Sequence, residues 1–430
     1  MEMRWLPQAS SSSNYTLDAV MARGDLPVFE WTTTARPKSL RQFWMVPVLL
    51  TFAVLTLTTY LLRPFPHFYA DESGSRSTKF TDAIDWHNSF PSSSPSAASG
   101  DRPKIGTVSV LWGTVPEAYH RAVARFAQYS RRYNYELSVL ERSVGSGHWS
   151  KTLHLMYLIL RELEKPDEDR LEWLLWFDAD VILINQEIPL ETFLPNTSNP
   201  LYEDIRFVAA RDGGGNNGGA SLNSGVFFAR VHIDSVRIFA KAYAYHLYHP
   251  DANFGNTYDQ TALQLVLMED QNRRHVLWEP HSWFNPHQHE WAPGALCAHF
   301  FFIGNKAAEM TNMLDSLDSG QQGGKAQVPY EKSFYSSELD AFWDWNRRVR
   351  ETLRVVEGFK LDETTSAFHI EMFNSTRLHL EDMLWHSDSY TKTGQEILDI
   401  EQRLDIALDE TWIEKSGKDD HSRADDDRGF

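Results

Sequence analysis

The sequence predicts an α/β domain with a mixed, mostly parallel sheet, preceded by one N-terminal transmembrane helix. Two observations indicate this fold class. Between residues 104 and 177, short apolar segments rich in β-branched residues alternate with amphipathic helical segments, as in parallel sheets whose strands are joined by helices. Residues 43–62 form an uncharged apolar stretch that is long enough to cross a bilayer core as a helix.

The composition narrows the class of protein. Of the 430 residues, 42% are hydrophobic and 13% are aromatic, which supports a substantial core and argues against global disorder. The net charge of −18 disfavours nucleic acid as a partner, because its phosphates would be repelled. The charge suits a neutral partner, or an anionic partner bridged by a metal ion. The single cysteine, Cys297, excludes an intramolecular disulfide.

The stretch 43–62 reads FWMVPVLLTFAVLTLTTYLL and is best explained as a membrane span. A buried core helix is disfavoured, because the segment is apolar on every face. A cleaved signal peptide is also disfavoured, because more than 40 residues precede the segment and its apolar run exceeds a typical signal core. The span is short and contains several threonines, which suits the thin membranes of the early secretory pathway.

Charges around the span predict its orientation. Arg36, Lys38 and Arg41 precede it, whereas only Arg63 follows closely, so the positive-inside rule places the N-terminus in the cytoplasm and the rest of the chain in the lumen. The following Ser/Pro-rich stretch, SFPSSSPSAASG, cannot bury a core and is typical of an extended stem. We therefore predict a cytoplasmic tail at 1–42, an anchor at 43–62 and a stem at 63–103.

Ordered structure is expected to resume at Lys104, where a domain spanning 104–375 begins, and helical stretches at 330–400 are expected to form a C-terminal extension of its core. Its first elements are a strand in IGTVSVLWG, a helix over 117–133, a strand in YELSVL, a helix over about 150–164 and a strand in LEWLLWF. Ligands bind beyond the carboxyl ends of the strands in such sheets. Residues 376–430 are predicted to form a helical, acidic and disordered tail.

Two carboxylates, Asp178 and Asp180, directly follow LEWLLWF. Because residues two apart in an extended chain point to the same side, both side chains are expected to converge where the strand ends. Hard oxygen ligands suit Mn²⁺ or Mg²⁺, and such an ion can hold a diphosphate leaving group. The alternative is a pair of solvated acids, since a bare Asp-x-Asp is short and frequent.

Two later segments carry polar groups suited to a sugar. The glycine-rich stretch 211–225 is expected to be a mobile loop that closes over a sugar, or else a flexible surface connection. It ends in Leu-Asn-Ser-Gly, where the amide of Asn223 offers both a donor and an acceptor to hydroxyl groups. Asp259 and Gln260 begin an amphipathic segment, where they either bind sugar hydroxyls or, for Asp259, cap the helix.

Aromatic and basic residues between 281 and 306 complete the candidate set. The segment HSWFNPHQHEW contains three aromatic rings, those of Trp283, Phe284 and Trp291. We expect these rings to form an acceptor wall against the apolar faces of a sugar, with ordinary loop packing as the alternative. The histidines of that segment lack the spacing of a helical zinc pair. His299 lies in an apolar strand and is either a core histidine or a third metal ligand, and Lys306 can reach a diphosphate.

The order of these motifs is similar to that in one enzyme family. WSK, then Asp-x-Asp, LN-x-G, DQ, and HF followed by Gly and Lys resembles the galactosyl/mannosyltransferases of glycosyltransferase family thirty-four, over about residues 104–306. The resemblance implies a GT-A-type, Rossmann-like domain in a type II Golgi membrane protein. It also implies Mn²⁺ (or Mg²⁺), a nucleotide sugar donor such as UDP-galactose, GDP-mannose or UDP-xylose, and retention of anomeric configuration.

The resemblance also implies a role for each matching residue. The metal ligands are Asp178, Asp180 and His299. The donor-binding residues are Lys151, Asp178, Ser224, Gly225 and Lys306. The residues that act on the donor sugar in catalysis are Asn223, Asp259 and Gln260.

This sequence departs from the family pattern at three points. Gly294-Ala295-Leu296 stands where many members have Gly-Asp-Phe, Asn305 stands where many have Cys, and the interval from His299 to the glycine is one or two residues longer. The predicted function is hexose transfer, of galactose or mannose, to a glycan in the Golgi lumen, with the endoplasmic reticulum as the less favoured site. The alternatives are a non-catalytic subunit of a Golgi glycosyltransferase complex and a lumenal glycan-binding protein.

Overall fold

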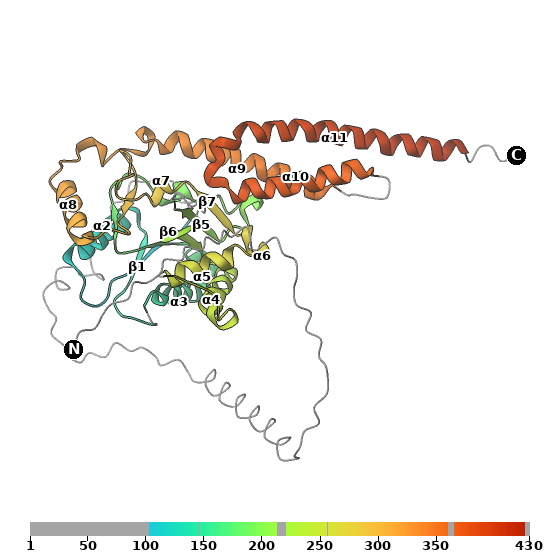
Figure 1. The fold of residues 1–430 in the computed structure, drawn as a ribbon. Coiled ribbons are helices and arrows are strands. Elements are labelled where there is room, and N and C mark those ends of the chain that lie inside the picture. Colours follow the sequence, from blue (N-terminus) through green and yellow to red (C-terminus); the bar gives the residue numbers. More distant parts are fainter. Residues whose placement is uncertain (1–102, 146, 213–220, 256, 360–364, 426–430) are drawn as a thin grey trace, which may run out of the picture. The chain divides into compact units, whose positions relative to one another are not determined.

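The computed structural model describes residues 103–425 except 146, 213–220, 256 and 360–364 (Figure 1). The predicted cytoplasmic tail, the anchor at 43–62 and the stem up to residue 102 lie outside the described residues. Within the described part, no helix combines the length and the apolar character needed to cross a membrane.

Six strands of the described chain form one mixed sheet in the order β2-β1-β3-β6-β5-β7. They are β1 (Ile105–Val110), β2 (Glu136–Leu140), β3 (Trp173–Phe177), β5 (Phe207–Arg211), β6 (Leu222–Arg230) and β7 (Val276–Glu279). β6 runs antiparallel to its neighbours β3 and β5, and the other pairings are parallel. The prediction of a mixed, mostly parallel sheet is confirmed.

The first half of the sheet follows the predicted alternation. α2 (Glu117–Tyr133) connects β1 to β2, and α3 (Trp149–Leu163) connects β2 to β3. Asn134 ends α2 in the left-handed conformation at φ 59°, and its backbone N–H bonds to carbonyls of the last turn. Every residue of β3 is buried, as expected for a strand covered on both faces, so its sequence is apolar throughout instead of alternating.

Helices cover both faces of the sheet. On one face, α3, α4 (Ile233–Tyr248) and α5 (Tyr258–Leu267) pack side by side over a core that contains Trp176 and Phe227 (Figure 1). On the other face, α2 shares a core with the C-terminal helices α9 (Tyr335–Gly358), α10 (Ala367–Trp385) and α11 (Tyr390–Asp425). The sheet edge that carries the strand ends lies between these layers.

Shorter elements extend the second half of the domain. β4 (Val181–Leu183) and β8 (Cys297–His299) form a separate antiparallel pair, and α8 (Lys306–Asp318) packs against α2. The other short helices are α6 (Asp270–Arg273) and α7 (His281–Phe284). Single turns of 3-10 helix lie at η3 (Asp167–Asp169), η4 (Leu190–Phe193), η5 (Pro200–Tyr202), η6 (Gly323–Lys325), η7 (Tyr330–Lys332) and η8 (Ser387–Ser389).

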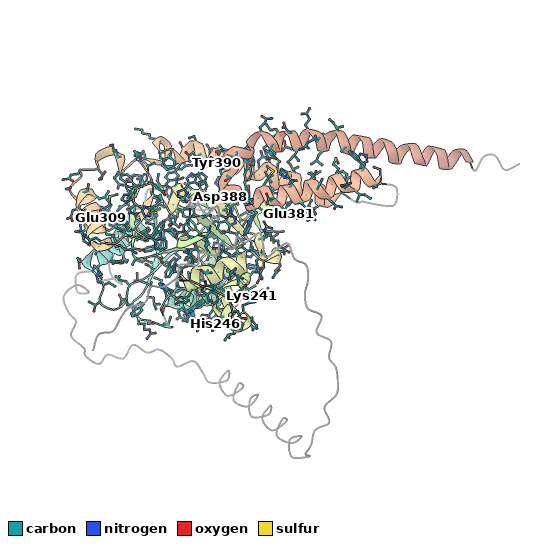
Figure 2. All side chains as sticks on the ribbon, in the orientation of Figure 1. Lys241, His246, Glu309, Glu381, Asp388 and Tyr390 are labelled. Atoms are coloured by element: carbon teal, nitrogen blue, oxygen red, sulfur yellow. The ribbon has the colours of Figure 1, made fainter. Side chains whose placement is uncertain are left out.

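The C-terminal region is helical, as predicted, but it differs from the expected disordered tail because much of it packs on the domain. The boundary placed at 375 falls inside α10, and the backbone is helical from Tyr390 to Asp425. α10 and α11 pack against α9 and bury Leu380 and Leu404 in the core that they share with the sheet. Figure 2 labels Asp388 and Tyr390, where α10 gives way to α11. The region at 376–407 therefore helps to close the domain.

Candidate functional site

The two predicted carboxylates meet in a turn. β3 ends at Phe177, and the backbone N–H of Val181 donates to the carbonyl of Asp178 at 3.0 Å as β4 begins. The turn, and not the extended spacing that the sequence predicted, brings Asp178 and Asp180 together. The indole N–H of Trp176 donates to Oδ1 of Asp178 at 2.7 Å and holds that carboxylate at the sheet edge.

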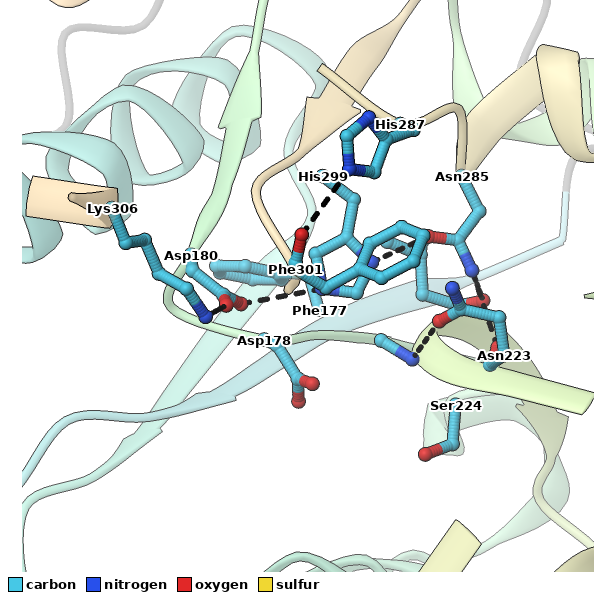
Figure 3. A network of polar contacts seen from close by, with 12 residues as sticks. Phe177, Asp178, Asp180, Asn223, Ser224, Asn285, His287, His299, Phe301 and Lys306 are labelled. Carbon is cyan, nitrogen blue, oxygen red and sulfur yellow. Dashed lines mark hydrogen bonds and ion pairs between the residues drawn. The ribbon is translucent and has the colours of Figure 1, made fainter. Parts of the chain in front are cut away.

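His299 reaches the same point from a distant part of the chain. β8 pairs with β4 so that Val181 faces His299, which brings Nε2 of the imidazole to 3.3 Å from Oδ1 of Asp180 (Figure 3). Asp178, Asp180 and His299 each offer one ligand atom, and these atoms lie within 4.8 Å of one another. The structure thus brings together the three predicted metal ligands.

The far side of the imidazole is held by an amide. Nδ1 of His299 lies 2.9 Å from Oδ1 of Asn285, whose Nδ2 donates to the backbone carbonyl of Asn223 at 3.2 Å. Because a carbonyl oxygen only accepts, Nδ1 donates in this contact, and Nε2 is the ring nitrogen that faces the carboxylates. Such an outer contact orients a histidine ligand for a metal, so two carboxylates and this imidazole fit Mn²⁺ or Mg²⁺.

Gly225 leaves the space that His299 occupies. A Cβ added at this position would lie 2.7 Å from Nε2 of His299 and nearer still to other ring atoms. The carbonyl of Gly225 also accepts from the backbone N–H of Asp178 at 2.7 Å. The glycine of the LN-x-G motif is therefore explained by the close approach of the imidazole, which no side chain permits.

A bulge in β6 brings the oxygens of Ser224 to the ammonium group of Lys151. Ala209 of β5 pairs with Phe227 of β6, but the next residue, Ala210, pairs with Asn223. Residues 224–226 of β6 therefore have no pairing partner on β5. The carbonyl and hydroxyl oxygens of Ser224 accept from Nζ of Lys151 at 2.9 and 3.2 Å. Bulges of this kind re-aim side chains and are frequent beside functional sites.

Lys151 contacts three of the predicted site residues, namely Ser224, Asp178 and Asp259. Its Nζ lies 3.0 Å from Oδ1 of Asp178 and 3.6 Å from Oδ2 of Asp259. Burial lowers the pKa of Lys151, but the two carboxylates raise it more, so the pKa stays above its ordinary value. Oε1 of the adjacent Gln260 accepts from the backbone N–H of Ser224 at 2.9 Å. The start of α5 therefore lies against the bulge.

Lys306 lies against Asp180 on the other side of the trio. Its ammonium donates to Oδ2 of Asp180 (Figure 3). Burial raises the pKa of Asp180, but the contacts with His299 and Lys306 outweigh burial and hold the pKa below its ordinary value. Burial lowers the pKa of Lys306, and the charge of Asp180 more than restores it. Both groups stay charged, so Lys306 is placed to bind an anion beside the carboxylates.

Asp212 is a site residue that the sequence analysis missed. Its Oδ1 accepts from Nδ2 of Asn223 at 2.5 Å, and Oδ1 of Asn223 accepts from the backbone N–H of Gly225 at 2.9 Å. Burial raises the pKa of Asp212, and the bond from Asn223 offsets this only in part. Its one signal in the sequence is its position before the glycine run, of which residues 213–220 lie outside the described part.

The predicted acceptor wall needs correction. Trp283 and Phe284 are 0% exposed, because α7 packs beneath the sheet and turns both rings into the core. Trp283 meets Phe342 edge-on at 5.2 Å and donates its indole N–H to Glu338 at 2.7 Å. Neither ring is open to an acceptor. Trp291 is half-buried against the core under β4 and β8.

The exposed ring nearest the metal ligands in sequence is Phe302. Its side chain is 85% exposed, and its backbone adopts the left-handed region at φ 52°, which is rare for a bulky residue. The ring of the neighbouring Phe301 lies tilted at 52° to the ring of His299, with the centroids 4.7 Å apart. The exposure of Phe302 could not be predicted from the sequence, because a run of three phenylalanines predicts a buried strand.

Comparisons with known proteins find similarity among solved structures but not among protein families or curated sequences. No protein-family model matches the chain, and no curated protein matches its sequence. Among solved structures, a glycosyltransferase involved in the glycosylation of the major capsid of PBCV-1 is 19% identical at a TM-score of 0.39, over 50% of this chain and 99% of that chain. A similarity of this size does not place the chain in a family, so function has to follow from the chemistry of the site.

Proposed function

We propose that the chain is a retaining, metal-dependent glycosyltransferase that moves a hexose from a nucleotide diphosphate sugar to a hydroxyl of a glycan. The observation that supports this most directly is the convergence of Asp178, Asp180 and His299, with ligand atoms within 4.8 Å of one another at the sheet edge. A divalent ion held there, Mn²⁺ being preferred and Mg²⁺ possible as a substitute, supplies positive charge for a diphosphate. Galactose and mannose are the proposed sugars.

The protein's own groups supply the remaining stabilisation. Lys306 supplies a positive charge to the departing diphosphate. Electrostatic stabilisation of this leaving group is expected to be the largest single contribution to catalysis. Asn223, Asp259 and Gln260 are proposed to bind the hydroxyls of the donor sugar. Lys151 fixes Asp178 and Asp259 in place through contacts of 3.0 and 3.6 Å, so the carboxylates need no rearrangement as charge develops.

The proposed chemistry is attack on the face from which the leaving group departs. The bond between C1 of the sugar and the phosphate oxygen breaks, the acceptor oxygen bonds to C1 on the same face, and its proton passes to the departing phosphate oxygen. A covalent intermediate on Asp259 is disfavoured, because this carboxylate is 6% exposed and paired with Lys151. Inversion of configuration in the product, read by NMR, would contradict this mechanism.

The proposed setting is the Golgi membrane, with the catalytic domain in the lumen. The uncharged stretch 43–62 and the basic residues ahead of it support a type II orientation. The acceptor sequences for N-glycosylation at Asn196 and Asn374 fit a lumenal domain, since both asparagines are exposed. Digestion of intact Golgi vesicles should spare the domain unless detergent is added.

Donor hydrolysis tests the proposal. The full chain, with Mn²⁺, is given UDP-galactose, GDP-mannose and UDP-xylose in turn, and Asp180→Ala serves as the control. We expect turnover of one donor, abolished by EDTA and reduced more than about 100-fold in the variant. Mn²⁺-dependent nucleotide binding without turnover would instead identify a non-catalytic subunit. Glycan binding that ignores nucleotide and metal would identify a glycan-binding protein.

A further inference from the structure

Arg211, the last residue of β5, joins the sheet to the C-terminal helices. Its side chain is 7% exposed. One terminal nitrogen donates to Oδ1 of Asp388 in η8 at 2.8 Å, and the other donates to the backbone carbonyl of Trp385 at 2.7 Å. Its guanidinium also lies over the ring of Trp278, 4.1 Å from the centroid. These contacts together hold one side chain to β7, α10 and η8.

We call this set of contacts around Arg211 the joint, and aromatic and cationic contacts of Trp385 add to it. Trp385 meets Trp278 edge-on at 5.4 Å, and the guanidinium of Arg273 lies 4.6 Å from the centroid of the Trp385 ring. Burial lowers the pKa of Arg211, and Asp388 restores it only in part. A buried guanidinium is costly unless it is paired and hydrogen-bonded, so Arg211 depends on Asp388 to remain in this position.

The same joint lies one residue from the proposed sugar site. Arg211 pairs with Leu222 across the β5–β6 ladder, and Asp212, the next residue, donates its backbone N–H to the carbonyl of Ser221 at 2.8 Å. The carboxylate of Asp212 in turn holds Asn223 at 2.5 Å. A shift of Arg211 therefore moves Asp212, and with it the amide proposed to bind the sugar.

We infer that Arg211 is a positioning residue, which places the Asp212–Asn223 pair for the donor sugar through its contacts with Asp388 and Trp385. The C-terminal helices then contribute to the sugar site, because they hold Arg211 in position. The inference rests on the proposed function, because it assigns the pair to the donor. Nucleotide and metal are served by other groups, namely Lys306 and the Asp178–Asp180–His299 trio.

Two variants test the inference against a matched control. Asp388→Asn keeps the shape of the side chain and removes the charge that Arg211 needs, and Arg211→Lys keeps the charge but loses the planar fork. Glu381→Gln removes a carboxylate from α10 that bonds to Arg377 at 2.5 Å and not to Arg211. All three are compared with the unaltered chain in the presence of Mn²⁺.

We expect both joint variants to bind UDP or GDP alone as the unaltered chain does. They should lose the additional affinity contributed by the sugar, and kcat for donor hydrolysis should fall about 10- to 100-fold, because a displaced group costs rate even far from the reacting atoms. Glu381→Gln should leave both quantities unchanged. Unchanged kcat in Asp388→Asn, or an equal loss of affinity for nucleotide and nucleotide sugar, overturns the inference.

Amide hydrogen exchange separates failure of the inference from failure of the proposed function. We expect amides of β5 and the first half of β6 to exchange faster in Asp388→Asn than in the unaltered chain or Glu381→Gln. Absence of nucleotide binding in the unaltered chain would sink the proposed function and leave this comparison in place. Equal exchange in all three proteins sinks the positioning role, whatever the activity.

Discussion

At the scale of single residues, the site depends on space that one glycine leaves open. Gly225 gives its backbone carbonyl to Asp178 and its empty side-chain position to the imidazole of His299. Gly304, which lies near His299 in sequence, has nothing within 4 Å of an added Cβ. These two glycines therefore have opposite tolerance for a methyl group.

Gly225→Ala is expected to weaken Mn²⁺ binding by at least about tenfold, because the methyl group displaces His299 from the carboxylates. Gly304→Ala is expected to bind Mn²⁺ like the unaltered chain. Calorimetric titration of Mn²⁺ in the presence of UDP or GDP measures both. Equal affinities for the two variants would show that the imidazole is not a ligand.

Glu279 ends β7 with a carboxyl group that is 0% exposed. Neither of its oxygens has a hydrogen-bond partner in the structure as described, and burial raises its pKa well above the ordinary value. A carboxyl whose pKa is raised by folding stabilises the folded state only while it stays protonated. The free energy of unfolding should therefore fall as pH rises from the pKa of the unfolded chain, about 4.3, toward the folded value.

Glu279→Gln is expected to remove this loss, because the amide imitates the protonated acid without ionising. The melting temperature of the variant should exceed that of the unaltered chain at pH 8 by at least about 2 °C and approach it at pH 4.5. Scanning calorimetry at both pH values checks the sign. A larger advantage at pH 4.5 than at pH 8 would contradict the assignment of a buried neutral acid.

At the scale of elements, sequence patterns were informative where apolar residues recur at a regular spacing. α2 coincides with its predicted range of 117–133, because its apolar residues recur at helical spacing. β4, β5 and β7 were not predicted, since each is short and apolar and offers no period to count. The role of Trp283 was misjudged because an aromatic residue in a polar loop sequence looks exposed until its helix is docked.

α10 provides a matched test of the packing at this scale. Leu380 is 0% exposed in the core shared with the sheet, whereas Leu378, two residues earlier, is 57% exposed. Leu380→Ala should lower the free energy of unfolding by about 2–5 kcal/mol, and Leu378→Ala by less than about 0.5 kcal/mol. Chemical denaturation followed by tryptophan fluorescence measures both. Similar losses would mean that α10 does not pack as the structure shows.

At the scale of the whole molecule, the metal trio was within reach of the sequence but its partners were not. Asp178 and Asp180 follow an apolar strand, and His299 lies within one, where the sequence left a core histidine open and the family resemblance favoured a metal ligand. The contact of Arg211 with Asp388 joins residues 177 positions apart, and no local pattern encodes it. The closing role of 376–407 was hidden for the same reason, because α11 has weak amphipathic character and a charged sequence.

The core that α9, α10 and α11 share with the sheet also has a consequence for biosynthesis. Leu175 and Phe228 belong to the same buried core as residues as late in the chain as Leu404. During translation, α2 covers part of this face early, and the rest of the face stays exposed until those helices leave the ribosome. We expect the nascent chain to remain dependent on chaperones until that point, and stalled products that end before α10 to aggregate.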